Sequence, residues 1–327
     1  MAEYYYEPTP ETEAQALEKK KVNTALTPLP EPYLTGLKLA ADISINGLTL
    51  NTIDENDVVW VVSEIDGWWT LPDPELPDLP RGWGDGSYDA VGRWANRLIT
   101  LTGSFLPQRP EDAAAARSSL MSAVSLVKTG GWLLVYEDKA TDPASNPRGA
   151  YVRLSGAPQI LSVNARGRHD FSIGLKAVDP TKYEFNASAD PDDGFSSTVI
   201  TTSSGSGSAV ITNTGNVAVP VVLELSSGFS IPSASNPPTI TNSTNGQSIP
   251  IIGGTSASNK LELDTYNREV LDVEYSGSTV VSSANGRAKV SVLVDWIYLE
   301  PGDNTLAVSN FPSGSTCTVY WRSGWIG

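Results

Sequence analysis

The stretch Pro220-Val221-Val222-Leu223-Glu224-Leu225 opens a series of short β-type runs in the last third of the chain. Each run is bounded by Gly, Pro, Asn or Asp, and three more follow: Leu261–Thr265, Asp295–Asn304 and Thr318–Arg322. No segment with helical periodicity interrupts them, and short strands at this spacing are typical of a β-sandwich. We therefore predict a C-terminal sandwich over residues 191–327.

Two clusters of small and polar residues separate this region from the one before it. We place the domain boundary at the first cluster, Asp190-Pro191-Asp192-Asp193-Gly194. The second cluster, Ser203–Ser208, is flanked symmetrically by Val199-Ile200 and Val210-Ile211. That symmetry predicts a hairpin tip within the second domain.

Residues 36–190 are predicted to form a β domain of the sandwich or split-barrel kind with one helix, so the whole chain is mainly β. Asn46-Gly47 is a hairpin signal between apolar residues. The helix is predicted at about 111–129, because acidic residues begin it and Gly130-Gly131 stops it. The remaining strands are predicted at Val58–Val62, Leu98–Thr102, Trp132–Tyr136, Tyr151–Leu154, Gln159–Val163 and Phe171–Ala177.

Between two of these strands, residues 66–89 form a long segment rich in Pro, Trp and Gly, without a periodic pattern. Loops of this length are usually functional or form interfaces. Tryptophan is a common anchor of protein interfaces, so we predict subunit or partner contacts at Trp68, Trp69, Trp83 and Trp94. Aromatic faces also stack on sugar rings, and a glycan platform remains the alternative, with further candidates at Trp296, Trp321 and Trp325.

Residues 1–35 are predicted to be an extended arm, because prolines interrupt them and such a segment buries little surface within its own chain. A short piece around Thr12–Lys21 is compatible with a helix. The arm is either disordered or lies on a neighbouring subunit. Interfaces are enriched in aromatic residues, and the second interpretation therefore includes Tyr4, Tyr5 and Tyr6 as contact residues.

The net charge of −15 argues against a nonspecific nucleic-acid binder, which needs clustered Lys and Arg. Five basic and nine acidic residues lie from residue 198 onward, so −11 of this charge lies in the first 197 residues. No apolar stretch is long enough for a transmembrane helix, and the start has no signal-peptide pattern. We therefore expect synthesis in a cytoplasm and no membrane insertion.

Catalytic, metal and cofactor sites are not predicted. The single histidine, His169, lacks the partners of a zinc set or a Ser-His-Asp triad, and we place it in a surface turn. The single cysteine, Cys317, excludes an intrachain disulfide and is expected to be a small buried strand residue. Two carboxylate pairs alternate along strands and are expected on solvated faces: Glu262 with Asp264 and Asp272 with Glu274. A glycosidase acting on the cell wall is the enzymatic alternative.

Several motifs follow one another in a specific order: Gly67-Trp68, Gly84-Asp85-Gly86, Thr100–Phe105, Trp132–Val135, Asp179-Pro180-Thr181-Lys182-Tyr183, Asn213–Asn216 with Pro220, and Leu299–Leu306. In this order the chain, over about residues 40–327, resembles the distal tail proteins of long-tailed bacteriophages (siphophages). The tryptophan-rich segment is most similar to tail proteins of phages that infect actinobacteria. The arm has no counterpart in the resemblance.

The resemblance implies a structural virion protein, not an enzyme, located at the tail tip and assembled in the host cytoplasm. Its first domain would form a homo-oligomeric ring, commonly of six copies, around the tail channel, where an acidic surface suits the passage of DNA. Its second domain would be a galectin-like sandwich. The implied partners are the tail tube protein, the tape measure protein and the hub or baseplate proteins. Host cell-wall glycan is the further partner under the carbohydrate-binding alternative.

Overall fold

The computed structural model of the protein describes residues 42–76, 79–83, 85, 87–88, 92–125, 129–137, 146–162, 168–186, 194–231, 235–277 and 279–327. All of them belong to one compact unit, Leu39–Gly327. The predicted arm with Tyr4, Tyr5 and Tyr6 lies outside the described residues. Residues 190–193 of the predicted domain boundary, Asp190–Gly194, also lie outside them.

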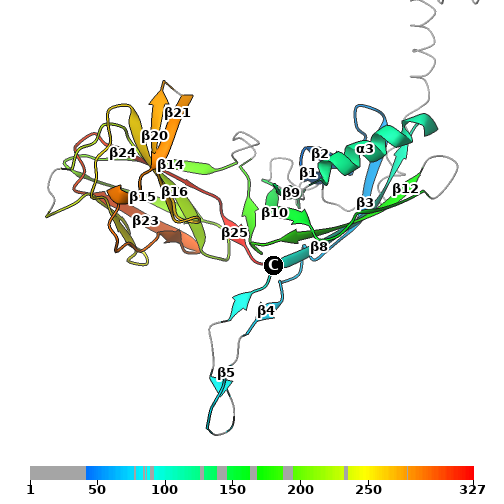
Figure 1. Ribbon diagram of the computed structural model, residues 1–327, viewed down its shortest axis with the longest axis horizontal. Helices are drawn as coiled ribbons and strands as arrows, with labels where there is room; N and C mark the ends of the chain where they lie inside the picture. Colours follow the sequence, from blue (N-terminus) through cyan, green and yellow to red (C-terminus); the bar gives the residue numbers. More distant parts are fainter. Residues whose placement is uncertain are drawn as a thin grey trace, which may run out of the picture. The chain divides into compact units, whose positions relative to one another are not determined.

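The first half of the unit is built on one antiparallel sheet (Figure 1). Its main path runs β2-β1-β9-β10-β12-β8-β3. The strands of the path are β1 (Asp42–Ile45), β2 (Leu48–Leu50), β3 (Val58–Asp66), β8 (Arg97–Pro107), β9 (Gly131–Tyr136), β10 (Arg148–Leu154) and β12 (His169–Ala177). Two shorter strands join at its side, β11 (Gln159–Ser162) on β12 and β13 (Lys182–Glu184) on β10.

Strict alternation of side chains builds the core of this sheet. Along β8 and β12, every second residue is buried, including Leu101, Phe105, Ile173 and Leu175. A strand places successive side chains on opposite faces, so one face of each strand enters a common hydrophobic cluster. The predicted strands of this region and the turn at Asn46-Gly47, with φ angles of 45° and 85°, are confirmed.

A single α-helix lies in the described part of the chain, α3 (Ala113–Ala123), after the 3-10 turn η1 (Pro110–Asp112). It buries Ala116, Leu120 and Ala123 against the sheet core. The helix ends at Ala123, well before the predicted end near residue 129. Valine and serine have low helix propensity, and the amide of Ser125 bonds to the carbonyl of Ser122 at 3.2 Å in a tighter turn.

The tryptophan-rich segment folds as an extended hairpin that leaves the main sheet between β3 and β8 (Figure 1). Two short ladders hold it, and neither pairs with the main sheet. The inner ladder joins β4 (Pro74–Glu75) to β7 (Arg93–Trp94), and the outer ladder joins β5 (Leu79–Pro80) to β6 (Ser87–Tyr88). We call residues 67–96 the tryptophan hairpin.

The second half is a β-sandwich, as predicted. One sheet runs in the order β14 (Ser196–Thr201), β24 (Thr316–Trp321), β16 (Val219–Leu225), β19 (Asn259–Asp264), β20 (Glu269–Ser276) and β21 (Thr279–Asn285), with β22 (Tyr298–Leu299) on β16. The other runs in the order β15 (Ser206–Asn213), β23 (Gly302–Ser309), β17 (Thr239–Asn242) and β18 (Ser248–Pro250). A 3-10 turn, η2 (Arg287–Lys289), follows β21. Leu223 of the first sheet and Leu306 of the second belong to one core cluster.

The predicted hairpin tip between β14 and β15 is present at Ser204-Gly205, where φ is 52° and 87°. Two consecutive positive φ angles are typical of a type I′ turn. The strands that it connects do not pair along their length, because β14 joins β24 and β15 joins β23. The turn therefore passes the chain from one sheet of the sandwich to the other.

Two buried asparagines fix turns in the sandwich. Asn304 accepts a hydrogen bond from the amide of Glu300 and donates to the carbonyls of Glu300 and Gly302, which closes the turn before β23. Asn213 donates to the carbonyl of Val217 at 2.8 Å. Buried polar groups need hydrogen-bond partners. These contacts therefore explain why asparagine occurs at both of these turns.

The last residues return to the first sheet. β25 (Gly324–Trp325) pairs with β13, so the C-terminal end of the sandwich adds a strand to the sheet of the first half. Gly215 packs so closely on this segment that a Cβ there would lie 1.8 Å from the carbonyl oxygen of Gly324. Only glycine fits at such an approach.

Candidate interaction site: the tryptophan hairpin and the junction cavity

The tryptophan hairpin exposes large apolar side chains along most of its length. Trp83, near its tip, is 97% exposed, and Trp69 and Trp94 are about half exposed at 51% and 42%. Leu71 and Leu76 are also exposed, at 57% and 64%. Several large exposed apolar side chains on one element are typical of interaction surfaces in soluble proteins. The hairpin therefore has the chemistry of a contact element.

The base of the hairpin is held by a buried arginine. Arg97, the first residue of β8, is 1% exposed. Its Nη1 donates to the carbonyls of Gly67, Trp68 and Thr70 at 3.0, 3.2 and 2.8 Å. Its Nε donates to the carbonyl of Pro180 at 2.9 Å. One guanidinium thus ties the first turn of the hairpin to the segment that leads into β13.

A second buried cation, Lys182, completes this base. Its side chain is 1% exposed, and its Nζ lies 3.2 Å from the carbonyl of Trp68 and 3.7 Å from Oε1 of Glu137. The pKa of Lys182 is lowered to about 8, mainly by burial. The charges of Arg97 and Arg148 also lower this pKa, whereas Glu137 raises it. Glu137 is therefore the acid that keeps this ammonium group in the interior.

Glu137 connects three elements. Its Oε2 accepts a hydrogen bond from Arg148 of β10 at 2.7 Å, and its Oε1 accepts one from Nε1 of Trp68 at 2.8 Å. The guanidinium of Arg148 lies 4.3 Å from the ring centroid of Trp325 in β25. We call the set Arg97, Lys182, Glu137, Arg148 and Trp68 the root cluster.

The position of Trp68 in the root cluster contradicts its predicted role as a contact residue. Trp68 is 0% exposed and belongs to the core of the first sheet, so an interface role is wrong for it. The turn before it is also tightly constrained: Gly67 has φ of 77°, and a Cβ there would lie 1.9 Å from the carbonyl oxygen of Leu98. Of the predicted tryptophan contacts in this segment, Trp69, Trp83 and Trp94 remain exposed.

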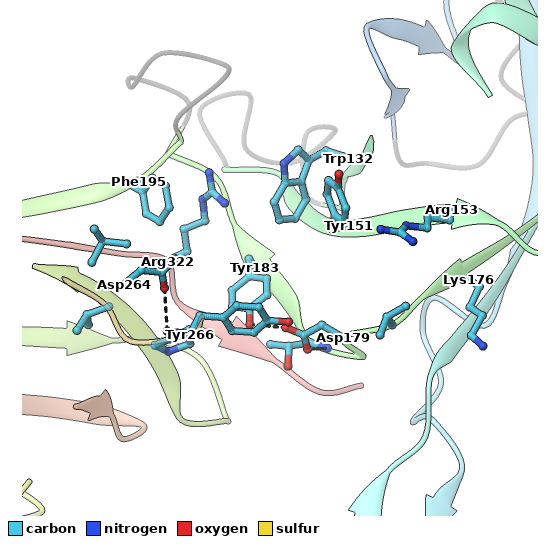
Figure 2. A pocket seen from close by; sticks show the side chains of 15 residues that line it. Trp132, Tyr151, Arg153, Lys176, Asp179, Tyr183, Phe195, Asp264, Tyr266 and Arg322 are labelled. Atoms are coloured by element: carbon cyan, nitrogen blue, oxygen red, sulfur yellow. Dashed lines mark hydrogen bonds between the residues drawn. The ribbon is translucent and has the colours of Figure 1, made fainter. Parts of the chain in front are cut away.

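A cavity of about 460 Å³ lies where strands of the first sheet meet the sandwich (Figure 2). Aromatic side chains dominate its lining: Trp132, Tyr151, Tyr183, Phe195 and Tyr266. Basic side chains lie with them: Arg153 of β10, Lys176 of β12 and Arg322, which follows β24. We call this space the junction cavity.

The acidic residues of the junction cavity already serve the fold. Asp179 accepts hydrogen bonds from the amide of Thr181 at 2.9 Å and the hydroxyl of Tyr183 at 2.7 Å. Burial raises the pKa of Tyr183, and the negative charge of Asp179 raises it further. Asp264 accepts the amide of Tyr266 at 2.9 Å (Figure 2). Both carboxylates therefore accept hydrogen bonds that stabilise the local fold.

The residues considered for chemistry have structural environments. His169 is 4% exposed and stacks on Phe105 with ring centroids 4.9 Å apart, so its predicted place in a surface turn is wrong. Burial lowers the pKa of His169, and nearby Arg117 lowers it further. Cys317 is buried, as predicted, and its pKa is raised to about 12 by burial and by Glu224.

The carboxylate pairs on β19 and β20 are also occupied by neighbours. Glu262 accepts a hydrogen bond from the hydroxyl of Tyr275 at 2.7 Å. Asp272 accepts Nζ of Lys289 at 2.5 Å, and Glu274 accepts the hydroxyl of Ser282 at 2.9 Å. Among the described residues, no group of three or more His, Cys, Asp or Glu side chains is placed to hold a metal ion.

The three tryptophans considered for sugar contact are partly buried. Trp321 donates from Nε1 to the carbonyl of Thr212 at 3.3 Å. The guanidinium of Arg287 lies over the ring of Trp296, 5.9 Å from its centroid, and that of Arg148 lies over the ring of Trp325. Guanidinium groups over two of these rings reduce the open aromatic face that a sugar would need.

Sequence reasoning missed the root cluster, although Lys182 lies in the quoted motif Asp179–Tyr183. It also missed the junction cavity, whose lining comes from segments far apart in the chain. In the described residues, no helix is long and apolar enough to cross a membrane.

Comparison with known proteins adds to this description. Residues 214–325 match the family model described as the siphovirus-type tail component, C-terminal domain. The crystal structure of the Dit protein of phage SPP1 is similar over 87% of this chain and 99% of that chain, with a TM-score of 0.56 and 15% identity. Residues 214–325 therefore carry a siphovirus-type tail component C-terminal domain, and the fold of the chain is Dit-like.

The SPP1 structure is described as a paradigm of the hub adsorption apparatus in phages that infect Gram-positive bacteria. The baseplate of phage P2 in its activated conformation with Ca contains a second similar chain, at 10% identity and a TM-score of 0.44. That similarity covers 86% of this chain and 98% of the other. No curated protein sequence matches this chain.

Proposed function

We propose that this protein is a structural component of the tail tip of a long-tailed phage, where copies of it form a ring. The ring would join the tail tube to the hub or baseplate and support attachment to the host. The exposed tryptophan hairpin on its buried root cluster carries this proposal. A rigid base with an apolar, exposed end is suited to contact another protein.

The type of contact that the hairpin can make supports a ring. The hairpin is a protruding element, and we propose that it meets a differently shaped surface of the next copy. When each copy gives its hairpin to one neighbour and receives one from another, the contact is heterologous, and it closes into a ring when the rotation allows. The net charge of −15 supports a channel lining to which DNA does not adhere.

The proposed partners are further copies of this chain, the tail tube protein, the tape measure protein and the proteins of the hub or baseplate. The proposed location is the tail tip of the virion, after assembly in the host cytoplasm. We propose no catalytic step, because the carboxylates considered for one act as hydrogen-bond acceptors within the fold.

The mass and shape of the purified chain test the ring. We expect light scattering to give a multiple of the 34.8 kDa chain mass, and negative-stain microscopy to show particles with an open centre. Particles of one chain mass at high protein concentration, with no ring on added tail tubes, would contradict the proposal.

A further inference from the structure

The junction cavity has a charge pattern that selects its occupant. Its carboxylates already accept hydrogen bonds within the chain, as described for Asp179 and Asp264. Arg153 is exposed, and Lys176 reaches only the side-chain amide of Asn96, at 3.3 Å. Neither of these two cations has an ion pair within the described part of the chain. The cavity therefore offers the positive charges of Arg153 and Lys176, whereas its carboxylates Asp179 and Asp264 are already hydrogen-bonded.

The rest of the lining is mostly aromatic, and the guanidinium of Arg322 lies 3.9 Å from the ring centroid of Phe195 and 5.0 Å from that of Trp132. The Tyr266 ring points to the middle of the cavity, and Arg153 and Lys176 lie at the opposite side from Phe195 (Figure 2). Aromatic rings contact one another and cations with favourable geometry. An occupant with an aromatic ring and a nearby negative charge would match both parts of the lining.

The tip of the tryptophan hairpin carries that combination. Trp83 is 97% exposed, and the exposed Asp85 follows two residues later. The outer ladder, β5 with β6, pairs with no other strand in the described part of the chain. An indole this exposed is available as an anchor for a partner, because tryptophan is enriched among the residues that carry binding energy at interfaces.

We infer that the junction cavity of one copy of this chain receives Trp83 and Asp85 from the hairpin of a neighbouring copy. The indole packs among the aromatic side chains, and the carboxylate faces Arg153 and Lys176. This inference rests on the proposed ring, and it names the two surfaces that meet between subunits.

Size and reach agree with this contact. Pockets of about 300 to 1,000 Å³ hold whole drug-sized molecules, so a cavity of about 460 Å³ accommodates an indole and a carboxylate. From Trp94 at the inner ladder to Trp83, an extended chain covers about 35 Å at about 3.3 Å per residue. That distance is comparable to the diameter of a small domain.

Disulfide trapping between two differently marked chains tests the contact. One chain carries Gly82→Cys, beside Trp83 at an exposed position where an added Cβ meets no atom within 4 Å. The other chain carries Val178→Cys, at a cavity residue that is 64% exposed. After mixing and mild oxidation, we expect a covalent heterodimer on a non-reducing gel. The native Cys317 does not compete, because it is buried and its pKa is raised to about 12.

The matched control replaces Val178→Cys with Val199→Cys, which is 57% exposed on β14 and does not line the cavity. Equal yields of the two heterodimers would overturn the inference. An intact oligomer without the Gly82–Val178 link would also overturn it while leaving the ring standing. If neither oligomer nor link forms, both the inference and the proposed ring fail.

Charge exchange gives a second test that does not depend on cysteine chemistry. We expect Asp85→Arg and Arg153→Glu each to weaken self-association at least tenfold. The double variant restores the opposite charges in reversed order, and we expect it to recover at least half of the loss on a logarithmic scale. Losses that simply add in the double variant would contradict a contact between these residues.

Discussion

The base and the tip of the tryptophan hairpin have similar sequences and opposite environments. Gly67-Trp68 stands at the base and Gly82-Trp83 near the tip. Trp68 is 0% exposed and donates a hydrogen bond to Glu137, whereas Trp83 is 97% exposed. The base therefore serves the folding of one chain, and the tip is available to a second chain.

The two ends also differ in how they use charge. At the base, Arg97 and Lys182 are each 1% exposed, and carbonyls or Glu137 surround them. Farther out, Arg93 pairs with Glu75 at 2.6 Å, with side chains that are 78% and 46% exposed. Charges need partners when they are buried and contribute little when they are solvated. Mutations at the two ends should thus act on different properties.

The largest expected contrast is between the two tryptophans. We expect Trp68→Ala to lower the free energy of unfolding by about 3 to 5 kcal/mol, because it empties a core site and leaves Glu137 with one partner fewer. We expect Trp83→Ala to change that free energy by less than about 0.5 kcal/mol. Urea unfolding of both variants measures this, and equal losses would contradict the division between base and tip.

Removal of the acid of the root cluster is the next largest effect. We expect Glu137→Ala to cost about 3 to 5 kcal/mol, because it leaves Lys182 and Arg148 without their carboxylate in a buried site. Urea unfolding near pH 7 measures the loss. A cost below about 1 kcal/mol would mean that water reaches the cluster and that the base is not a buried site.

The pH dependence of stability sharpens the same comparison. The pKa of Lys182 is about 8 in the folded chain and 10.5 as its ordinary value, so between these pH values the unfolded chain binds more protons. The free energy of unfolding then rises with pH, by at most about 1.4 kcal/mol per pH unit. The free-energy cost of burying the charged Lys182 side chain is complete below pH 8, and it decreases as the pH rises above 8.

Unfolding measured at pH 7, 8 and 9.5 checks this rise. Lys182→Met is the matched variant, because it keeps the length of the side chain and removes its titration. We expect its stability to be flat in this window and at least equal to that of the native chain at pH 7. A rise of the same size in the variant would assign the titration to another group.

The smallest effect is expected at the exposed pair of the inner ladder. We expect Glu75→Ala to change the free energy of unfolding by less than about 1 kcal/mol, since both partners of this ion pair are solvated. Thermal unfolding at low and at high salt would detect the change. A loss as large as that of Glu137→Ala would show that the hairpin folds cooperatively with the sheet.

The sequence predicted what depends on neighbouring residues. Alternation along β8 and β12 gives their buried faces, and Asn46-Gly47 and Ser204-Gly205 occupy turns with positive φ, as their residue types favour. The end of α3 was less predictable. Val124 continues the apolar spacing of the helix, yet its backbone has φ of −89° and ψ of 0°, outside the helix.

The site was less predictable because its contacts are distant in sequence. Trp68 and Glu137 are 69 residues apart, and Arg97 and Pro180 are 83 residues apart. No local pattern distinguishes a tryptophan that will meet a buried glutamate from one that will meet water. For this reason Trp68 and Trp83 received the same prediction, and only the packing of the chain separated them.

The most direct test of the account is sedimentation velocity of the Trp83→Ala variant beside the native chain, at concentrations where the native chain assembles. The account predicts a native ring and a variant that sediments as a folded monomer, because the indole is the central contact between copies. A variant that assembles as fully as the native chain would contradict it.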